Sequence, residues 1–490
     1  MTPKISDKLM KVDETERQAI ISFFSTIILT FFGFFSTVYF AHKLGAEVLG
    51  EYGIFIAYFG TFTLFSNAGF GSAAIKKISE GKERDEYFTA SAVIRLLLLF
   101  ATVIAAVIAA PIFVDFSGTG LYPFMIAALI ISYFGITVQS SVYGTGKVGL
   151  SEIARLSNEI VRIALQIIFV YAGFKSGGLA GGFIAGMLVA AFINLKNNDL
   201  KLKSFKIVHL REMYKYSFWI FMASGGAVIT SYAGTVLIGY FNANYDVGIY
   251  TTVYQFTTIV AFASAALQTA LYPKISRWHA EGKTGYIENA LSRAITYSLL
   301  LALPACAGGI MLGERLLYFL YGADFAKGAL ALSLLLVAQI FCIFVNLGAS
   351  SLNAISHPEK SFKAGIVVSA ICLLLNLILI PVAGINGAAA ATLISFLVGS
   401  LIFGYIIKQY VKLKFQKIIL RNIVFSTAAM AAVISASMIL IKPSDWLSTL
   451  LLVSIGAFVY VLVLLKTDKT ISDDLKDLLH DLNIPVPGLN

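Results

Sequence analysis

The chain is short of charged residues. Only 13% of its 490 residues are Asp, Glu, Lys or Arg, whereas about 25% are charged in an ordinary soluble domain. Hydrophobic residues account for 58% of the chain, and the mean hydropathy is +0.82. Because a globule of this length cannot bury so much apolar surface, the composition excludes a soluble enzyme, a disordered chain and a disulfide scaffold. It predicts a membrane protein.

The sequence also lacks the residue patterns of catalytic and metal sites. Its five histidines are scattered, and it contains neither HExxH nor a Cys/His spacing typical of a metal site. The three cysteines, Cys306, Cys342 and Cys372, all lie in apolar runs, where a thiol usually behaves as a small hydrophobic group. We therefore expect that the protein is not an enzyme and holds no metal and no cofactor.

Two glycine motifs have structural interpretations. The GxGxxG at 144–149 lies in a short connection between two apolar runs and not after a strand of a βαβ unit, so a nucleotide site is not expected. No GxxxxGK[ST] is present, which argues against ATP hydrolysis. The GxxxG at 182–186 predicts close packing of two membrane helices.

What the sequence does contain is a series of long apolar runs. They are continuous over about 20 residues, which is enough for a helix to cross a bilayer, whereas a barrel strand alternates over about 10. The first run lacks the cleavage site of a signal peptide, so we expect it to be retained. We predict fourteen transmembrane helices, at 19–41, 51–73, 89–112, 121–143, 152–174, 177–195, 216–240, 249–272, 294–313, 328–350, 361–382, 386–408, 421–441 and 446–466.

The basic residues predict the orientation of these spans. If the N-terminus is cytoplasmic, 29 of the 37 Lys and Arg fall in segments on the cytoplasmic side and five fall in outer loops. Only Arg95, Arg155 and Arg162 remain inside spans and away from the span ends. Because cytoplasmic loops carry an excess of positive charge, we predict an even number of spans with both termini cytoplasmic. Much of the net charge of +10 is then explained by topology, and nucleic acid is not expected as a partner.

The chain repeats itself across its two halves. Residues 50–52 (Gly-Glu-Tyr) open the second span and residues 248–250 (Gly-Ile-Tyr) open the eighth, displaced by 198 positions. Arg95 and Arg293 follow at the same displacement. A repeat of six spans, an even number, inserts both halves in the same orientation and gives a pseudo-two-fold axis along the membrane normal.

This repeat defines the predicted fold class and domains. We expect an all-α membrane protein with two parallel six-helix lobes around a central cavity, followed by two C-terminal helices. The predicted segments are a cytoplasmic N-terminal segment at 1–18, an N-lobe at 19–195, a cytoplasmic linker at 196–215, a C-lobe at 216–408, spans 13 and 14 at 421–466, and a cytoplasmic tail at 467–490.

The fifth span carries a stripe of charged residues. Glu152, Arg155, Glu159 and Arg162 follow one another at spacings of 3, 4 and 3, and Gln166 continues the stripe. These spacings place alternating charge on one helix face. With a rise of about 1.5 Å per residue, Arg162 lies about 18 Å from the predicted cytoplasmic end of the span, close to the middle of the bilayer.

Two interpretations of this stripe remain open. In the first, Glu152 with Arg155 and Glu159 with Arg162 are satisfied pairs that hold helices together. In the second, the stripe faces an inward-opening cavity whose guanidinium groups bind an anionic headgroup, because Arg stays charged and its planar fork binds phosphate oxygens in a bidentate manner. Arg95, about 10 Å into the third span, would add another guanidinium group.

Uncharged polar side chains also occur in or beside the spans. Asn67, Gln139, Tyr254 and Gln255 are candidates to line a wet lumen and to form exchangeable hydrogen bonds with sugar hydroxyls. For each of them taken singly, an interhelical hydrogen bond or a place in an interfacial aromatic belt is the alternative.

Taken together, these features resemble a known family. The arrangement of six, six and two spans, the segment LGAEVLGEYG at 44–53, the segment NAGFG at 67–71 and Arg95 in the third span are similar to the oligosaccharide-lipid flippases of the Wzx and polysaccharide-synthesis type. These flippases belong to the multidrug/oligosaccharidyl-lipid/polysaccharide (MOP) exporter superfamily. The resemblance covers essentially the whole chain in layout. It implies alternating access that moves a polyprenyl-diphosphate-linked oligosaccharide, a surface polysaccharide repeat unit of O-antigen type, from the cytoplasmic to the outer leaflet.

The charged residues of the spans fit this cargo, and the resemblance also implies partners. Arg95, Arg155 and Arg162 would contact the diphosphate, and Glu152 and Glu159 would orient the Arg pair or couple transport to an ion. The implied partners are the polyprenyl-diphosphate-linked glycan, membrane lipids, and the glycan polymerase and ligase machinery. The implied location is the cytoplasmic membrane.

Rival functions share parts of this pattern. A MATE-type cation-coupled antiporter for drugs or metabolites has the same architecture, but that branch resembles proteins with an acidic cation site in span one or seven. No Asp or Glu occurs in 19–41 or 216–240. A non-transporting scaffold or scramblase is a second alternative, and a flippase for a cell-wall precursor lipid differs from the main prediction only in its cargo.

Overall fold

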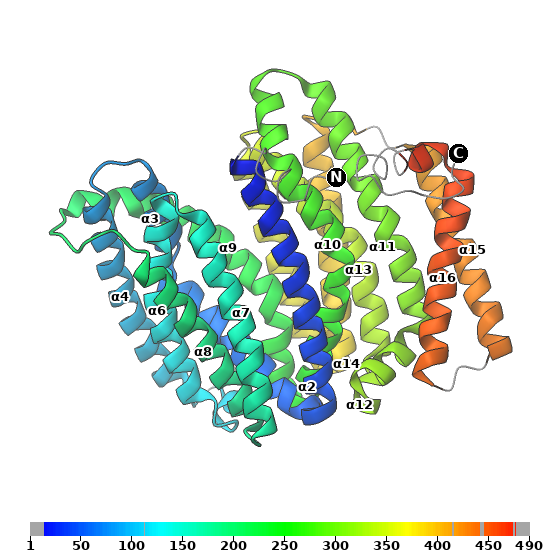
Figure 1. Ribbon diagram of the computed structural model, residues 1–490, viewed down its shortest axis with the longest axis horizontal. Coiled ribbons are helices and arrows are strands. Elements are labelled where there is room, and N and C mark those ends of the chain that lie inside the picture. The colour runs from blue at the N-terminus through cyan, green and yellow to red at the C-terminus, as the bar shows by residue number, and fades with distance from the viewer. Residues whose placement is uncertain (1–13, 112, 414–415, 442–444, 474–475, 477–490) are drawn as a thin grey trace, which may run out of the picture. The chain divides into compact units, whose positions relative to one another are not determined.

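The computed structural model describes residues 14–111, 113–413, 416–441, 445–473 and 476. Within these residues the chain is almost entirely helical and contains no strand, so the predicted all-α class is confirmed (Figure 1). The helices of ten residues or more are α2 (Glu14–Asn67), α3 (Phe70–Ser79), α4 (Arg84–Ala109), α6 (Tyr122–Gly144), α7 (Val148–Tyr171), α8 (Lys175–Lys196), α9 (Ile207–Phe241), α10 (Asn244–Ala280), α11 (Thr284–Tyr321), α13 (Ala329–Ala354), α14 (Pro358–Lys408), α15 (Lys417–Ile441) and α16 (Trp446–Thr467). Two short helices, α5 (Val114–Ser117) and α12 (Ala323–Ala326), lie between them.

Each predicted span overlaps a helix. Among the described residues, ten helices are long and apolar enough to cross a membrane, so a multi-pass membrane protein is confirmed. α2 and α14 each contain two predicted spans, joined by a backbone break at Gly45 (φ 75°, ψ 179°) and at Gly384 (φ 55°, ψ −132°). α7, with its four charged residues, and α10 are not among the ten. The count of fourteen spans stays a prediction.

The chain divides into two compact units. Unit 1 comprises Met1–Thr252 and Leu373–Ile385, and unit 2 comprises Val253–Cys372 and Asn386–Asn490. The division cuts α10 and α14, so each of these helices contributes to both units. The predicted boundaries of the lobes, the linker and the tail stay predictions.

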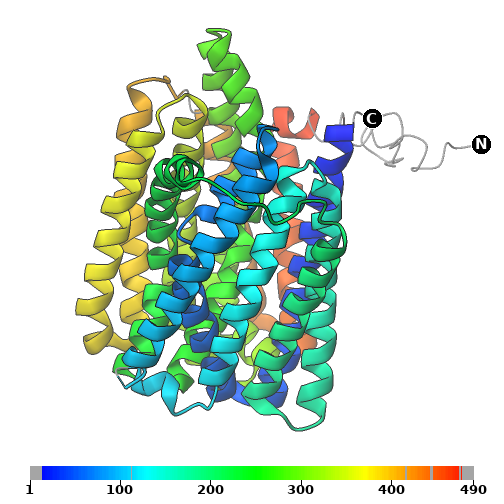
Figure 2. The same ribbon diagram turned by 90° about the vertical axis from the view of Figure 1, so that its left-hand side faces the viewer.

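Unit 1 contains the charged span. α7 and α8 pack along each other, and α6 packs against both. The short helix α3 contacts α4, α6 and α9 through Ala73, Ala74 and Ile78, which are almost fully buried. The segment between α8 and α9 crosses the end of α4 (Figure 2), where the backbone N–H of Lys201 donates to Asp85 at 3.0 Å.

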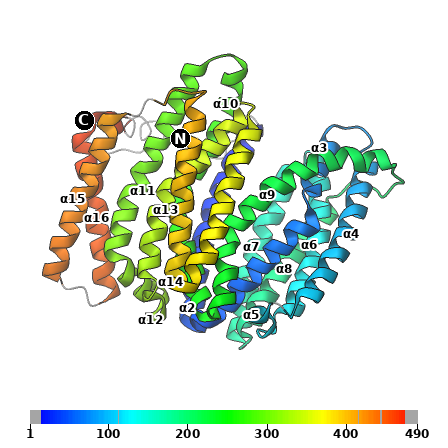
Figure 3. The same ribbon diagram turned by 180° about the vertical axis from the view of Figure 1, so that it is seen from behind.

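Unit 2 is built around α11. This helix packs against α13, α15 and α16, and Figure 3 shows α15 and α16 side by side next to it. The Tyr460 hydroxyl of α16 donates to the Leu300 carbonyl of α11 at 2.7 Å. Asn422 of α15 donates to Asp468, just beyond α16, at 3.0 Å. The two C-terminal helices are therefore joined to unit 2 by polar contacts as well as by apolar packing.

Candidate functional site

The charged stripe of α7 forms two ion pairs within the helix. Arg155 donates from Nε to Glu152 Oε2 at 2.9 Å and from Nη2 to the same oxygen at 2.8 Å. Arg162 donates from Nε to Glu159 Oε2 at 3.0 Å and pairs with the same oxygen through Nη2. Tyr143 of α6 donates its hydroxyl to Glu152 Oε1 at 2.6 Å. The predicted pairs are confirmed, and both lie on one helix, so they compensate charge within α7 and do not themselves join two helices.

Glycines of α8 bring its backbone against α7. A Cβ added at Gly182 would lie 2.8 Å from the Gln166 nitrogen and 3.0 Å from the Arg162 carbonyl oxygen. A Cβ added at Gly186 would lie 2.6 Å from the Asn158 carbonyl oxygen. Any larger residue at either position must separate the helices, so the predicted role of the GxxxG motif in close packing is confirmed.

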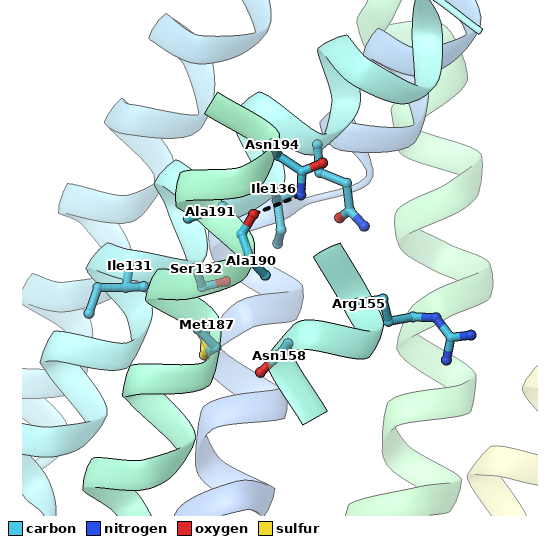
Figure 4. Close-up of a pocket in the computed structure, with 11 residues that line it drawn as sticks. Ile131, Ser132, Ile136, Arg155, Asn158, Met187, Ala190, Ala191 and Asn194 are labelled. Atoms are coloured by element: carbon cyan, nitrogen blue, oxygen red, sulfur yellow. Dashed lines mark hydrogen bonds between the residues drawn. The ribbon is translucent and has the colours of Figure 1, made fainter. Parts of the chain in front are cut away.

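A polar hollow lies where α6, α7 and α8 meet. Its volume is about 160 Å³. Asn158 and Asn194 face it from α7 and α8, and Arg155 extends away from them (Figure 4). The lining residues are Ile131, Ser132, Gly135, Ile136, Gln139, Arg155, Asn158, Met187, Ala190, Ala191 and Asn194. Of the predicted site residues, the hollow brings Gln139 and Arg155 together.

Two amide oxygens of this hollow are poised to accept hydrogen bonds. The Oδ1 atoms of Asn158 and Asn194 are buried and have no hydrogen-bond partner among the described residues, while Asn194 Nδ2 donates to the Ala190 carbonyl at 3.0 Å. A buried acceptor without a partner costs free energy of about 1–3 kcal/mol. The hydroxyl of a sugar or a water molecule that entered the hollow would recover it.

Arg95 belongs to α4, and its side chain contacts a face of α6 that does not line the hollow. Its residue is only 1% exposed, its Nη1 donates to Thr137 Oγ1 at 2.8 Å, and its guanidinium carbon lies 5.6 Å from the centroid of the Tyr133 ring. Within the described part of the chain, Arg95 Nε has no hydrogen-bond partner and the guanidinium group forms no ion pair. Gln139 and Ser132 face the hollow from a different side of α6. The structure therefore does not bring Arg95 into the hollow with Arg155.

The remaining predicted residues have separate surroundings. Asn67 accepts the backbone N–H of Gly71 at 3.1 Å, so its oxygen holds the junction between α2 and α3. Tyr254 is half-buried and Gln255 is exposed on the part of α10 that belongs to unit 2, and neither lines the hollow. Arg162 is half-buried beside Gly186, with its own backbone against α8. Their roles in substrate binding stay predictions.

The sequence contained a signal for the two asparagines of the hollow. Asn158 lies three positions after Arg155 on the stripe, and Asn194 lies eight positions after Gly186 on the glycine face of α8. Helix periodicity places both on the interface between α7 and α8. The GxGxxG segment, in contrast, forms the turn from α6 to α7, where a Cβ at Gly144 would lie 2.7 Å from Ile78 Cβ.

Unit 2 contains a larger apolar cavity. Its volume is about 540 Å³, and it lies among α10, α11, α13, α15 and α16. Leu300, Leu336, Met430 and Tyr460 are among the residues that line it. The cavity suits a hydrocarbon chain and not a sugar, because its wall is almost entirely apolar.

Comparisons with known proteins agree with this fold. Residues 16–279 match the family described as "Polysaccharide biosynthesis protein". A probable low-salt glycan biosynthesis flippase of Haloferax volcanii is 26% identical over 92% of this chain and 95% of its own length. A probable lipid II flippase of Thermotoga maritima is 27% identical over 58% of each chain.

Solved structures show the same fold. A lipid II flippase, MurJ, in an inward closed conformation superimposes with a TM-score of 0.76 at 20% identity, over 94% of this chain and all of the other. An inward-facing multidrug resistance MATE transporter of the MOP superfamily superimposes with a TM-score of 0.63 at 18% identity, over 78% of this chain and 95% of the other.

Proposed function

The chain belongs to the polysaccharide biosynthesis protein family, and on this premise we propose that it is a flippase for a lipid-linked glycan. The cargo is a polyprenyl-diphosphate-linked oligosaccharide, and alternating access carries it from the cytoplasmic to the outer leaflet. The relatives described as glycan and lipid II flippases and the likeness in fold to a lipid II flippase support this proposal.

The observation that carries the proposal is the polar hollow of unit 1. Two buried amide oxygens face it that have no hydrogen-bond partner among the described residues, and Arg155, paired with Glu152, is one of its lining residues. Sugar hydroxyls donate to amide oxygens, and a diphosphate is recognised by guanidinium groups. In this proposal Arg155 and Arg162 exchange their carboxylate partners, Glu152 and Glu159, for phosphate oxygens when the cargo binds.

The lipid part of the cargo needs an apolar surface. The cavity of unit 2, with a volume of about 540 Å³, offers such a surface to part of a prenyl chain. The apolar wall of this cavity matches the prenyl part of the cargo.

We further propose that the protein lies in the cytoplasmic membrane with both termini in the cytoplasm. The distribution of Lys and Arg, 29 on one side and five on the other, supports this orientation. A lipid-linked repeat unit delivered to the outer leaflet is a substrate for glycosyl transfer, so glycan polymerase and ligase machinery are the partners that would consume it.

A transport assay tests the function directly. The purified chain is reconstituted into vesicles that contain a prenyl-diphosphate glycan with a nitrobenzoxadiazole-labelled sugar, and dithionite is added outside. We expect the protected fluorescence of the inner leaflet to decay with time only in vesicles that contain the protein. A protected fraction equal to that of protein-free vesicles would exclude the proposed function.

The MATE-type antiporter is the weaker alternative. The MATE structure shares the fold but covers less of the chain than the lipid II flippase does, and residues 19–41 and 216–240 contain no Asp or Glu. Transport of a cationic dye that depends on a proton or sodium gradient, in vesicles where the labelled glycan stays protected, would favour it.

A further inference from the structure

A basic hollow lies at the end of unit 1 where α3 meets the first turns of α9. Its volume is about 350 Å³. It is separate from the polar hollow of α6, α7 and α8, with which it shares no lining residue. The lining residues are Ala73, Lys76, Lys77, Glu212, Lys215 and Tyr216.

The two helices that form this basic hollow are held in backbone contact. Gly69, at the N-terminus of α3, has a left-handed conformation (φ 79°), and a Cβ there would lie 2.5 Å from the Ser217 carbonyl oxygen of α9. Met213, one turn earlier on α9, is fully buried against Ala73 and Ala74 and their neighbours. This close packing fixes the positions of the α3 and α9 backbones that carry the lysines of the hollow.

One of the three lysines is neutralised. Lys77 Nζ pairs with Glu212 at 2.8 Å and with Glu80 at 3.1 Å, and the hydrogen bond that Lys77 donates to Glu212 helps to hold the pKa of Lys77 above its usual range. The Tyr87 hydroxyl also donates to Glu212, at 2.6 Å. The one carboxylate of the hollow is thus already engaged.

The other two lysines retain their charge without a carboxylate partner. Lys76 and Lys215 form no ion pair within the described part of the chain, and Lys76 Nζ lies 4.2 Å from the centroid of the Tyr216 ring. The hollow therefore has two uncompensated ammonium groups and a phenol hydroxyl at its rim, a set of groups that binds a phosphate.

The surroundings indicate that this phosphate belongs to a lipid. Tyr214, Phe218 and Trp219 on the same turns of α9 are exposed, Trp219 by 60%. Exposed aromatic side chains beside basic ones are typical of the membrane interface, where lipid headgroups lie. A free anion would gain nothing from these apolar side chains, whereas a lipid places its phosphate beside Lys76 and Lys215 and its chains beside the aromatic rings.

We propose that the hollow between α3 and α9 is a binding site for the phosphate of an anionic lipid, with Lys76 and Lys215 as its cationic groups. The phosphate belongs either to a bilayer phospholipid or to a prenyl diphosphate, since both present the same group at the same depth. The proposal goes beyond glycan transport and does not depend on it.

Trp219 provides the readout, because it lies one turn from Lys215 on α9. The chain has three tryptophans, so the variant W278F/W446F retains only this one. The full-length protein is placed in phosphatidylcholine vesicles, and quenching of Trp219 by brominated phosphatidylglycerol is compared with quenching by brominated phosphatidylcholine. We expect the anionic lipid to quench preferentially.

The double variant K76Q/K215Q removes both cationic groups. We expect it to lower the relative association constant of the anionic lipid about 30-fold, since each basic side chain contributes about 1 kcal/mol at an anionic surface and about 1.4 kcal/mol is tenfold.

The controls separate charge from general damage. Lys274 is exposed and follows the eighth span, as Lys77 follows the second. K274Q should therefore leave the preference for the anionic lipid unchanged. K76R/K215R keeps both positive charges and should retain this preference. Equal quenching by the two lipids, or a K76Q/K215Q protein with an undiminished preference, would overturn the proposal. Competition by geranylgeranyl diphosphate at concentrations where unlabelled phosphatidylglycerol fails would assign the site to a prenyl diphosphate, and the reverse order would assign it to a bilayer lipid. Because the readout requires no transport, its failure would leave the proposed function untouched.

Discussion

Gly50 and Gly248 lie in backbone contact where α2 passes the first turns of α10. A Cβ added at Gly50 would lie 1.7 Å from the Asn244 carbonyl oxygen, and one added at Gly248 would lie 1.8 Å from the Ala46 carbonyl oxygen. The displacement of 198 positions that relates Gly50 to Gly248 also relates Ala46 to Asn244. The contact is therefore reciprocal, as it is wherever two equivalent elements meet at a two-fold axis. This reciprocity supports the internal repeat from within unit 1.

The first prediction concerns this contact. G50A and G248A should each lower the free energy of unfolding by about 1–3 kcal/mol, because the added carbon overlaps backbone that cannot move aside alone. Their effects should not add in the double variant, since both disturb the same crossing. Thermal unfolding in detergent measures this. G33A is the matched control on α2, because no atom lies within 4 Å of a Cβ there; an equal loss in G33A and G50A would contradict the interpretation.

Two neighbouring glycines of α8, Gly181 and Gly182, provide a closely matched test variant and control. G182A should destabilise the protein and slow transport, since its Cβ would lie 2.8 Å from the backbone nitrogen of Gln166. G181A should be tolerated, because its Cβ would meet only Phe169 and Phe124 side chains at 3.5 Å or more. The cost of overpacking is about 1–3 kcal/mol. Thermal unfolding and the vesicle assay read the two effects, and similar values for the two variants would argue against backbone contact between α7 and α8.

Variants of Arg162 test whether this residue binds the diphosphate or only neutralises Glu159. R162A should reduce transport about 10–100-fold, because a hydrogen bond to a charged group is worth about 1.5–3 kcal/mol and about 1.4 kcal/mol is tenfold. The neutral pair E159Q/R162Q leaves no unpaired carboxylate, yet transport should remain low if Arg162 binds the diphosphate. Recovery of normal flipping in this double variant would show that Arg162 is needed only as the partner of Glu159.

Substitution of Arg95 should affect transport without lowering the free energy of unfolding. R95M preserves most of the side-chain volume and removes a buried charge that has no carboxylate partner among the described residues, so unfolding stability should be unchanged or higher. If Arg95 contacts the cargo, transport should fall in this variant. T137V, which removes the hydroxyl that accepts from Arg95 Nη1, is the control for local packing. Normal transport by R95M would remove Arg95 from the substrate site.

Reporter fusions test the orientation. A reporter joined after residue 200, in the segment between α8 and α9, should report the cytoplasm. One joined after residue 245, at the start of α10, should report the outside, because α9 separates the two positions. Alkaline phosphatase and green fluorescent protein activities distinguish the two sides. Cytoplasmic signal from both fusions would contradict the proposed topology.

Periodicity in the sequence predicted some contacts well and others not at all. The spacing of three within Glu152–Arg155 and Glu159–Arg162 requires that the partners share a helix face, and the structure pairs them. The GxxxG spacing likewise predicts a flat helix face, and Gly182 and Gly186 form it. These features depend on one helix alone, so a single sequence suffices.

Features that depend on a second helix were beyond the sequence. Periodicity could not show that Arg95 faces Thr137, away from the hollow, because the neighbour of a helix face is set by tertiary packing. Nor could it show that the oxygen of Asn67 accepts a backbone N–H at the start of α3. Periodicity places Asn158 and Asn194 at one interface, but it could not show that their oxygens face a hollow there. An asparagine on a membrane helix has the same local signal in each case.

The ion pairs of α7 have a consequence for movement. An ion pair that joins two helices must break when those helices slide, and in hydrocarbon the separated charges would have no water to solvate them. Both pairs of α7 lie within the helix, so α7 carries its own counter-charges through any displacement. Gly182 and Gly186 fix α8 to the same helix. α7 and α8 can therefore move past their neighbours without separating an ion pair of α7, although movement past α6 breaks the hydrogen bond from Tyr143 to Glu152.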